Sequence, residues 1–392
     1  MPLIKANQLS AASAATNDPG RTLVVILAAM VAQQVLLNLW SLLSYKDIIY
    51  VPRFWPGFDI LDFFRASRDF LAGSPPYAEK QFVTPPLSVF IAMPFLPLGW
   101  PAGIFAFFVV NLAMVATAIA LVARRFSIYS VREIALLAAI SGLYYPAYFL
   151  LERGNIDGVA MVCVGLVIWA AGRSVAAAFV VLGASIKIYP AVLAVWFVAG
   201  RQWRSLWIGA VTAVVSVAAV WSLWPAFAQT IGHRSTYFGA DENASLFNLV
   251  VPLAHICHLS RMVGIILGIV MIAGFLGVHA VSDWRKAAAG MMPQDQAARV
   301  ALYIPFFVAA PMTVYPYTQV CFLLLLPVFL RLVQTGVASQ WARAYFTAGF
   351  LCTAVQATAW VNFTGHPGFH FLSSIGTMLV LIACALVKWQ WR

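Results

Sequence analysis

Charged residues are scarce in this chain, at 9% of 392 residues, whereas soluble domains carry roughly 25%. Hydrophobic residues make up 62%, so a soluble globular protein is excluded. The longest polar interval, from about residue 45 to residue 84, is too short to conceal a soluble domain. The composition therefore predicts an all-α integral membrane protein.

Other signals are missing as well. The five cysteines lie mostly in apolar runs and form no Cys-x-x-Cys pair, which argues against a disulfide or metal framework. No glycine-rich phosphate loop and no internal repeat is present, and the missing repeat weakens the case for a transporter built from inverted halves. The first twenty residues lack the apolar core and cleavage site of a signal peptide. We expect residues 1–20 to form a disordered cytoplasmic tail and residues 21–392 a single transmembrane domain.

Long apolar segments account for most of the chain. Two stretches, 84–99 and 175–199, are apolar but broken by prolines, and we expect them to be re-entrant or interfacial, because irregular backbone at membrane depth must line a cavity or be covered by protein. Together with the uninterrupted segments they predict a bundle of about 10 to 12 transmembrane helices. The uninterrupted segments are 22–44, 101–123, 132–150, 157–172, 205–225, 261–283, 300–314, 317–334, 341–361 and 371–390.

The net charge of +11 is interpreted as a topology signal and not as a nucleic-acid-binding property. With both termini in the cytoplasm, most Lys and Arg residues lie inside, as the positive-inside rule favours. The unusual polar groups then collect on the outer face, beginning with the loop 45–84. We expect a multi-pass protein of the bacterial cytoplasmic membrane whose site faces outward.

The stretch from Gly57 to Gly73 concentrates charge directly after the first apolar segment. Asp59 stands where an N-cap would, and Gly73 stands where a helix-ending glycine would. A helical wheel separates an apolar face from a charged face, whose spacings let carboxylates and guanidiniums pair. The apolar face holds Ile60, Phe63, Phe64, Phe70 and Leu71, and the charged face holds Asp62, Arg65, Arg68 and Asp69. The pattern predicts an amphipathic helix at the membrane surface.

Asp59 projects away from the charged stripe, and we expect it to have no cation partner, which makes it available for chemistry; the alternative is a plain N-cap. Lys187 lies between two apolar half-segments, where a lysine costs about 2.5 to 3.5 kcal/mol on insertion scales and needs a partner. That partner is either a lipid phosphate or a buried carboxylate such as Asp157, unless the lysine simply reaches the interface.

An ordered set of motifs resembles glycosyltransferase family 87 of the GT-C superfamily. Its first part is an aspartate after the first span, a glycine fourteen residues later, a tyrosine and a Pro-Pro element, here Asp59, Gly73, Tyr77 and Thr84-Pro85-Pro86.

The later motifs are Arg153-Gly154-Asn155, the element from Gly183 to Pro190, and Asn243-Ala244-Ser245-Leu246. The resemblance covers about residues 20–335. A histidine that the family carries in a further element is missing from Pro311–Tyr317, so Tyr315, Tyr317 or His370 must replace it or the donor differs.

This resemblance implies transfer of a sugar, a hexose such as mannose or a pentose, from a polyprenyl-phosphate donor to a hydroxyl of a lipid or cell-envelope glycan outside the membrane, with inversion. It implies that Asp59 is the general base and that Lys187, with Arg153 or Arg234, binds the donor phosphate. No cofactor is expected, and the resemblance does not exclude that a divalent metal takes part. Expected substrate contacts are Asp62, Tyr77, Asn155, Asp157, Asn243, Tyr315, Tyr317 and His370.

A secondary transporter or lipid flippase is the competing interpretation. Intramembrane charges would then mark a transport path, and polar groups would lie near the midplane of the membrane. The concentration of polar groups on one face favours the enzyme.

Overall fold

The structure is a computed structural model that describes residues 19–44, 58–77, 82, 84–99, 102–232, 244–287, 290–311, 316–354 and 371–391. These residues form helices, turns and short 3₁₀ segments, with no strand among them. The 3₁₀ segments are η2 (Pro86–Phe90), η3 (Met93–Leu98), η4 (Tyr189–Leu193), η5 (Trp221–Leu223) and η6 (Pro316–Leu324). The α-helices are α2 (Pro19–Ser44), α3 (Phe58–Leu71), α4 (Ala102–Arg125), α5 (Val131–Leu143), α6 (Tyr145–Arg153), α7 (Asp157–Trp169), α8 (Ala176–Ile186), α9 (Ala194–Ala199), α10 (Trp203–Ala219), α11 (Trp224–Gly232), α12 (Phe247–Ile256), α13 (Arg261–Ala287), α14 (Pro293–Ala301), α15 (Phe306–Ala309), α16 (Leu325–Gln334), α17 (Gln340–Ala354) and α19 (Leu372–Gln390).

Three of the described helices, α4, α13 and α19, are each long and apolar enough to cross a membrane. A fourth crossing results if α10 and the helical segment after it, which are bent by 71° at a short break, count as one span. The bundle of 10 to 12 spans is not confirmed, because many apolar segments form shorter helices. α7, for example, has 13 residues and is therefore about 20 Å long, which is less than the hydrocarbon thickness of a bilayer.

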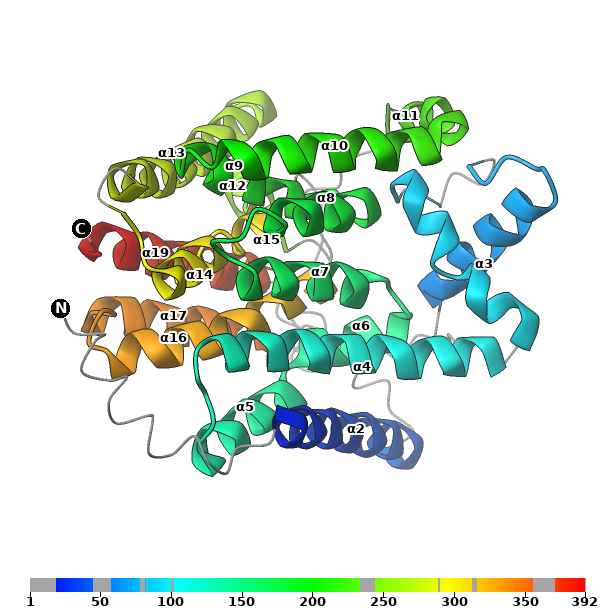
Figure 1. Cartoon of the computed structure of the whole chain (residues 1–392), viewed down its shortest axis with the longest axis horizontal. Coiled ribbons are helices and arrows are strands. Elements are labelled where there is room, and N and C mark those ends of the chain that lie inside the picture. Colours follow the sequence, from blue (N-terminus) through cyan, green and yellow to red (C-terminus); the bar gives the residue numbers. More distant parts are fainter. Residues whose placement is uncertain are drawn as a thin grey trace.

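The helices α4, α7, α8 and α10 run roughly along the long axis of the molecule and are stacked side by side across it, each packed against the next (Figure 1). Helix α3 and the two 3₁₀ segments η2 and η3 pack together at one end, and the last turn of α19 lies at the other end. Asp157 and Trp169 are the first and last residues of α7, so this helix leads from the end that carries α3 towards the opposite end.

Two hydrophobic cores hold these elements. The larger one joins residues from α4, α7, α14, α16 and α19, and the smaller one surrounds α3. In the smaller core, Ile60, Phe63 and Phe64 of α3 join Val89 of η2 and Ile156, which directly precedes α7. This core fixes α3 against the start of α7.

The predicted helix after the first apolar segment is present as α3. Gly73 adopts a left-handed conformation (φ 74°), as expected of a helix-ending glycine. Two details of the prediction are wrong. Asp59 lies within the first turn and not at the N-cap, because the helix begins at Phe58, and Leu71 is 65% exposed although the helical wheel placed it on the apolar face. Asp62 pairs with Arg65 at 3.6 Å, as the spacing predicted.

The two proline-broken stretches are irregular, as predicted. Residues 84–99 contain only η2 and η3, and residues 175–199 are divided into α8, η4 and α9. The second break falls at Lys187, whose backbone is extended (φ −139°, ψ 127°). The break therefore places the lysine side chain at the junction of two helical segments.

Candidate active site

Asp59 is bound by two residues that lie more than ninety positions further along the chain. The Arg153 guanidinium contacts Asp59 Oδ1 through two nitrogens, at 2.9 Å from one terminal nitrogen and 3.1 Å from Nε. The Asn155 side chain donates a hydrogen bond to Asp59 Oδ2 at 2.8 Å. The expectation that Asp59 has no cation partner is therefore wrong, because α6 delivers an arginine to the first turn of α3.

The turn between α6 and α7 explains how Arg153 and Asn155 reach the same carboxylate. Gly154 ends α6 in a left-handed conformation (φ 66°), which a side chain would disfavour, and this turn redirects the chain after Arg153. Ile156 then anchors the turn in the small core beside α3. The side chain of Asn111 in α4 donates to the backbone oxygen of Asn155 at 2.7 Å. The turn thus brings Arg153 and Asn155 to Asp59, and Asn111 of α4 holds the turn in place.

A second polar cluster is centred on Asp157, which is fully buried in the first turn of α7. The Lys187 Nζ lies 3.2 Å from Asp157 Oδ2, so the buried carboxylate that the sequence offered as a partner is the one observed. Tyr189 and Thr318 donate hydrogen bonds to Asp157 Oδ1 at 2.7 and 3.3 Å. Lys187 keeps 15% of its side chain exposed. Its ammonium is thus compensated by Asp157, while part of the lysine side chain remains exposed.

The spacing between Gly183, Lys187 and Pro190 has a packing reason. A Cβ atom at Gly183 would lie 3.1 Å from Cys163 Cβ and 3.4 Å from Pro190 Cβ, so the glycine lets α8 approach α7 and the proline closely. Pro190 lies in the first turn of η4, where its missing N–H is tolerated. The motif therefore shapes the break that presents Lys187 to Asp157.

The contacts described for Tyr77 and Asp62 do not involve Asp59 or Asp157. Asp62 pairs with Arg65 of its own helix. The Tyr77 hydroxyl donates to the backbone oxygen of Thr84 at 2.8 Å, and its ring packs against Phe82 and Phe227. Burial raises the pKa of Tyr77 well above its ordinary value, so the hydroxyl remains a donor. The interactions described for Tyr77 therefore tie the chain after α3 to the small core and do not reach Asp59.

Several predicted site residues cannot be placed. The residues that lie outside the described part of the chain are Arg234, Asn243, Tyr315 and His370. Tyr317 belongs to η6, but its side chain is also outside the described part.

Three residues that contact the site were not selected from the sequence. Asn111 is the only residue with a side-chain amide in the apolar segment 101–123, and that was the available signal. Tyr189 lies within the Gly183 to Pro190 element, but nothing local shows that its hydroxyl points to Asp157. Thr318 comes from η6, 161 positions after Asp157, and no local pattern predicts that contact.

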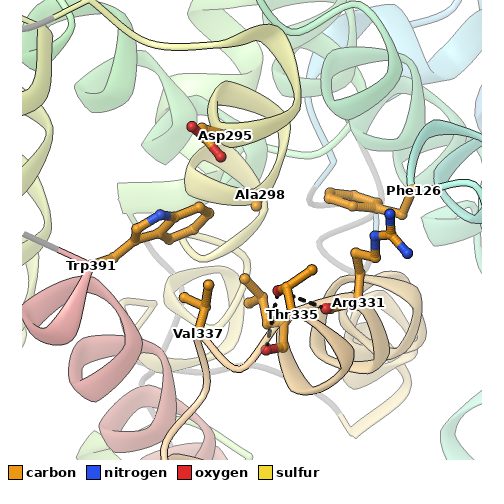
Figure 2. Close-up of a pocket in the computed structure, with 8 residues that line it drawn as sticks. Phe126, Asp295, Ala298, Arg331, Thr335, Val337 and Trp391 are labelled. Atoms are coloured by element: carbon orange, nitrogen blue, oxygen red, sulfur yellow. Dashed lines mark hydrogen bonds between the residues drawn. The ribbon is translucent and has the colours of Figure 1, made fainter. Parts of the chain in front are cut away.

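A separate small cavity lies between α14, α16 and the residue that follows α19 (Figure 2). Figure 2 shows Asp295 and Arg331 apart from each other on its walls, with Trp391 on the side of Asp295 and Phe126 on the side of Arg331. Its volume of about 20 Å³ is close to that of a single water probe, so it is too small for a sugar. This cavity is therefore excluded as the sugar site, and the candidate active site is formed by the two polar clusters around Asp59 and Asp157.

The sequence matches the model of glycosyltransferase family 87 over residues 82–302, more than half of the chain. The chain belongs to glycosyltransferase family 87. It is accordingly a glycosyltransferase, with a sugar donor and an acceptor as its substrates. The comparison with curated proteins found no match.

The matched range of this family 87 glycosyltransferase includes Arg153, Asn155, Asp157 and Lys187 but not Asp59. Asp59 is connected to that range by its contacts with Arg153 and Asn155. The resemblance had extended over about residues 20–335, so the family match is narrower at both ends.

Proposed function

We propose that this glycosyltransferase transfers a sugar, a hexose such as mannose or a pentose, from a polyprenyl-phosphate donor to an acceptor hydroxyl on the outer side of the bacterial cytoplasmic membrane. The acceptor is a hydroxyl of a lipid or of a cell-envelope glycan. Its oxygen attacks the anomeric carbon while the bond from that carbon to the phosphate oxygen breaks. Polyprenyl phosphate leaves, and a single displacement inverts the configuration.

Asp59 is the proposed general base that takes the proton of the acceptor hydroxyl. Each carboxylate oxygen has two lone-pair directions, and Asn155 uses only one of them at Oδ2, so an acceptor hydroxyl has a place to bind. The Asp59 side chain is 16% exposed, which leaves it reachable from outside. Arg153 and Asn155 hold the carboxylate in one orientation, and such positioning is itself a large part of catalysis.

The donor phosphate is proposed to bind Lys187 and Arg153, with Arg234 as a further contact. Arg153 is 24% exposed, and its planar guanidinium carries N–H donors whose geometry suits phosphate oxygens. A cation beside the leaving phosphate stabilises the charge that grows as the bond breaks. The break at Lys187 and the irregular segment 84–99 are the proposed walls of the groove for the prenyl chain. Asp62, Tyr77, Asn155, Asp157, Asn243, Tyr315, Tyr317 and His370 remain proposed substrate contacts.

One observation supports this proposal most strongly. Asp59 lies outside the family match, yet it contacts both Arg153 and Asn155, which lie inside it. A residue that served only to begin α3 would have no need of a guanidinium from α6 and an amide from the turn that follows it. The contact therefore connects the proposed base with the part of the chain that carries the family identity.

The test uses the full chain in membranes with labelled polyprenyl-phosphate sugars and measures transfer or release of the label. We expect Asp59→Asn to lower transfer by about 10²- to 10⁴-fold, the usual contribution of a general base. Asn keeps a similar shape but does not accept the proton as a carboxylate does.

Asp69→Asn is the matched control, because it removes the same charge from the same helix without touching Arg153 or Asn155. We expect it to keep at least half of the transfer activity. Asp59→Asn with full activity would contradict the base assignment, and no transfer from any polyprenyl-phosphate sugar would contradict the donor class.

A further inference from the structure

A large open cavity lies at the far end of α7 from Asp59. It has a volume of about 530 Å³, within the range of ligand pockets in proteins. Its walls come from the turn after α7, the turn between α9 and α10, and the residues around the end of α13 and the start of α14. The proposed glycosyl-transfer reaction uses none of these residues.

The charge of this cavity has one sign. Arg201 and Arg204 line it, together with the polar side chains of Ser174, Gln202 and Gln296, and no acidic residue is among its lining. Both arginines are exposed, and neither forms an ion pair with a carboxylate within the described part of the chain. The two arginines therefore offer N–H donors to an anion from outside the protein, since no acidic side chain lines the cavity.

Arg201 is held in position by its surroundings. Its backbone is left-handed (φ 53°), a conformation that suits glycine better than a residue with a side chain. Its guanidinium lies 3.9 Å from the centroid of the Trp284 ring of α13. A guanidinium stacked on a ring still presents N–H donors at its edge, and these donors match phosphate oxygens.

The neighbourhood of the cavity is basic as well. Arg125 donates to the backbone oxygens of Ala171 and Pro293, which places the end of α4 beside the turn after α7 and the start of α14. Arg285 and Lys286 occupy the last turn of α13. An anion that approaches this end of the molecule meets an excess of positive charge.

The surface that continues from the cavity is apolar. Along α10, Trp203, Trp207, Val211, Val214 and Val215 are all exposed, with Trp207 at 71% and Val214 at 69%. These positions recur every three or four residues, so they form one stripe along the helix. Tryptophans near charged groups, followed by an aliphatic stripe, are the arrangement that suits a membrane interface.

We propose that this cavity binds the phosphate headgroup of an anionic phospholipid from the leaflet at this end of the molecule. Arg201 and Arg204 contact the phosphate oxygens, the polar side chains contact headgroup hydroxyls, and the acyl chains lie along the α10 stripe. The apolar stripe favours a lipid over a free phosphate, because a soluble anion would make no use of it.

The test measures binding of individual lipids to the purified full chain in a neutral detergent by native mass spectrometry. The probes are phosphatidylglycerol, phosphatidylcholine with the same acyl chains, and glycerol 3-phosphate. We expect phosphatidylglycerol to bind the unchanged protein most tightly. Each basic residue near a membrane surface contributes a similar free energy to the binding of anionic lipid. Arg204→Gln should therefore weaken phosphatidylglycerol binding about 5-fold, and R201Q/R204Q should weaken it about 10- to 30-fold.

The matched control is R124Q/R132Q, which removes two exposed arginines from α4 and α5 that do not line the cavity. Phosphatidylglycerol binding that falls equally in this control would show a general charge effect and overturn the proposal. Equal binding of phosphatidylcholine or of glycerol 3-phosphate would overturn the assignment to an anionic lipid. Arg204→Gln leaves the Arg201 contact with Trp284 in place, so it tests the site if the double variant fails to fold.

Discussion

Helices α13, α14 and α19 are joined by a buried ionic network whose charges do not cancel. Asp283 is fully buried and contacts Arg299 at 2.9 Å and Lys388 at 2.5 Å, and Tyr303 donates to it at 2.8 Å. Arg299 is 1% exposed and Lys388 is fully buried. Among the described residues, Asp283 is thus the one carboxylate that forms ion pairs with both buried cations.

The two halves of this network should respond very differently to mutation. Asp283→Asn leaves two buried cations without an anion, and breaking a buried ion pair in this way costs about 3 to 5 kcal/mol. Lys388→Met removes the excess cation and leaves a balanced pair of Asp283 and Arg299, so the change should be about 1 kcal/mol or less. We therefore expect Asp283→Asn to be far more destabilising than Lys388→Met.

Thermal unfolding of the full chain in detergent checks this order of stability. The double variant D283N/K388M should recover part of the stability that Asp283→Asn loses, because only one uncompensated cation remains. Equal destabilisation by Asp283→Asn and Lys388→Met would refute the reasoning, since the excess of positive charge would then have no energetic consequence. An unchanged melting temperature in Asp283→Asn would refute the pairing itself.

Three further outcomes are expected near the candidate active site. Arg153→Lys should lower sugar transfer about 10- to 100-fold at unchanged protein levels, because lysine keeps the charge but does not reproduce the two-nitrogen contact that orients the carboxylate. Asp157→Asn should destabilise the protein by about 3 kcal/mol in thermal unfolding because it removes the buried carboxylate that compensates the Lys187 ammonium, and an additional Lys187→Met should restore part of the loss. Gly158→Ala should cost about 1 to 3 kcal/mol, because the new Cβ would lie 2.0 Å from Asn111 Oδ1; full stability would show that the asparagine moves aside freely.

Local features of the structure could be predicted from short stretches of sequence. The helix 58–71 follows from its amphipathic pattern and from Gly73, and the break at Lys187 follows from the nearby proline, since these signals act within a few residues. The pairing of Lys187 with Asp157 could also be anticipated. A lysine in apolar surroundings needs an anion, and few carboxylates were available in the neighbouring segments.

The partner of Asp59 could not be predicted in the same way. A wheel drawn for α3 alone shows Asp59 off the charged stripe and therefore without a cation, but Arg153 reaches it from α6, 94 positions away. Leu71 was misplaced for a related reason, since the wheel does not show where the packing of α3 against its neighbours ends. The network of Asp283, Arg299 and Lys388 likewise depends on how three helices meet.

The sequence by itself determined the apolar helical character of this protein, the position of the charged helix, the breaks at the prolines and the resemblance to family 87. Each of these depends on composition or on residues close to one another in the chain. Only the tertiary structure decided which charges neutralise each other and which remain exposed to a ligand. The energy of an ion pair depends on separation and burial, and helix packing determines both.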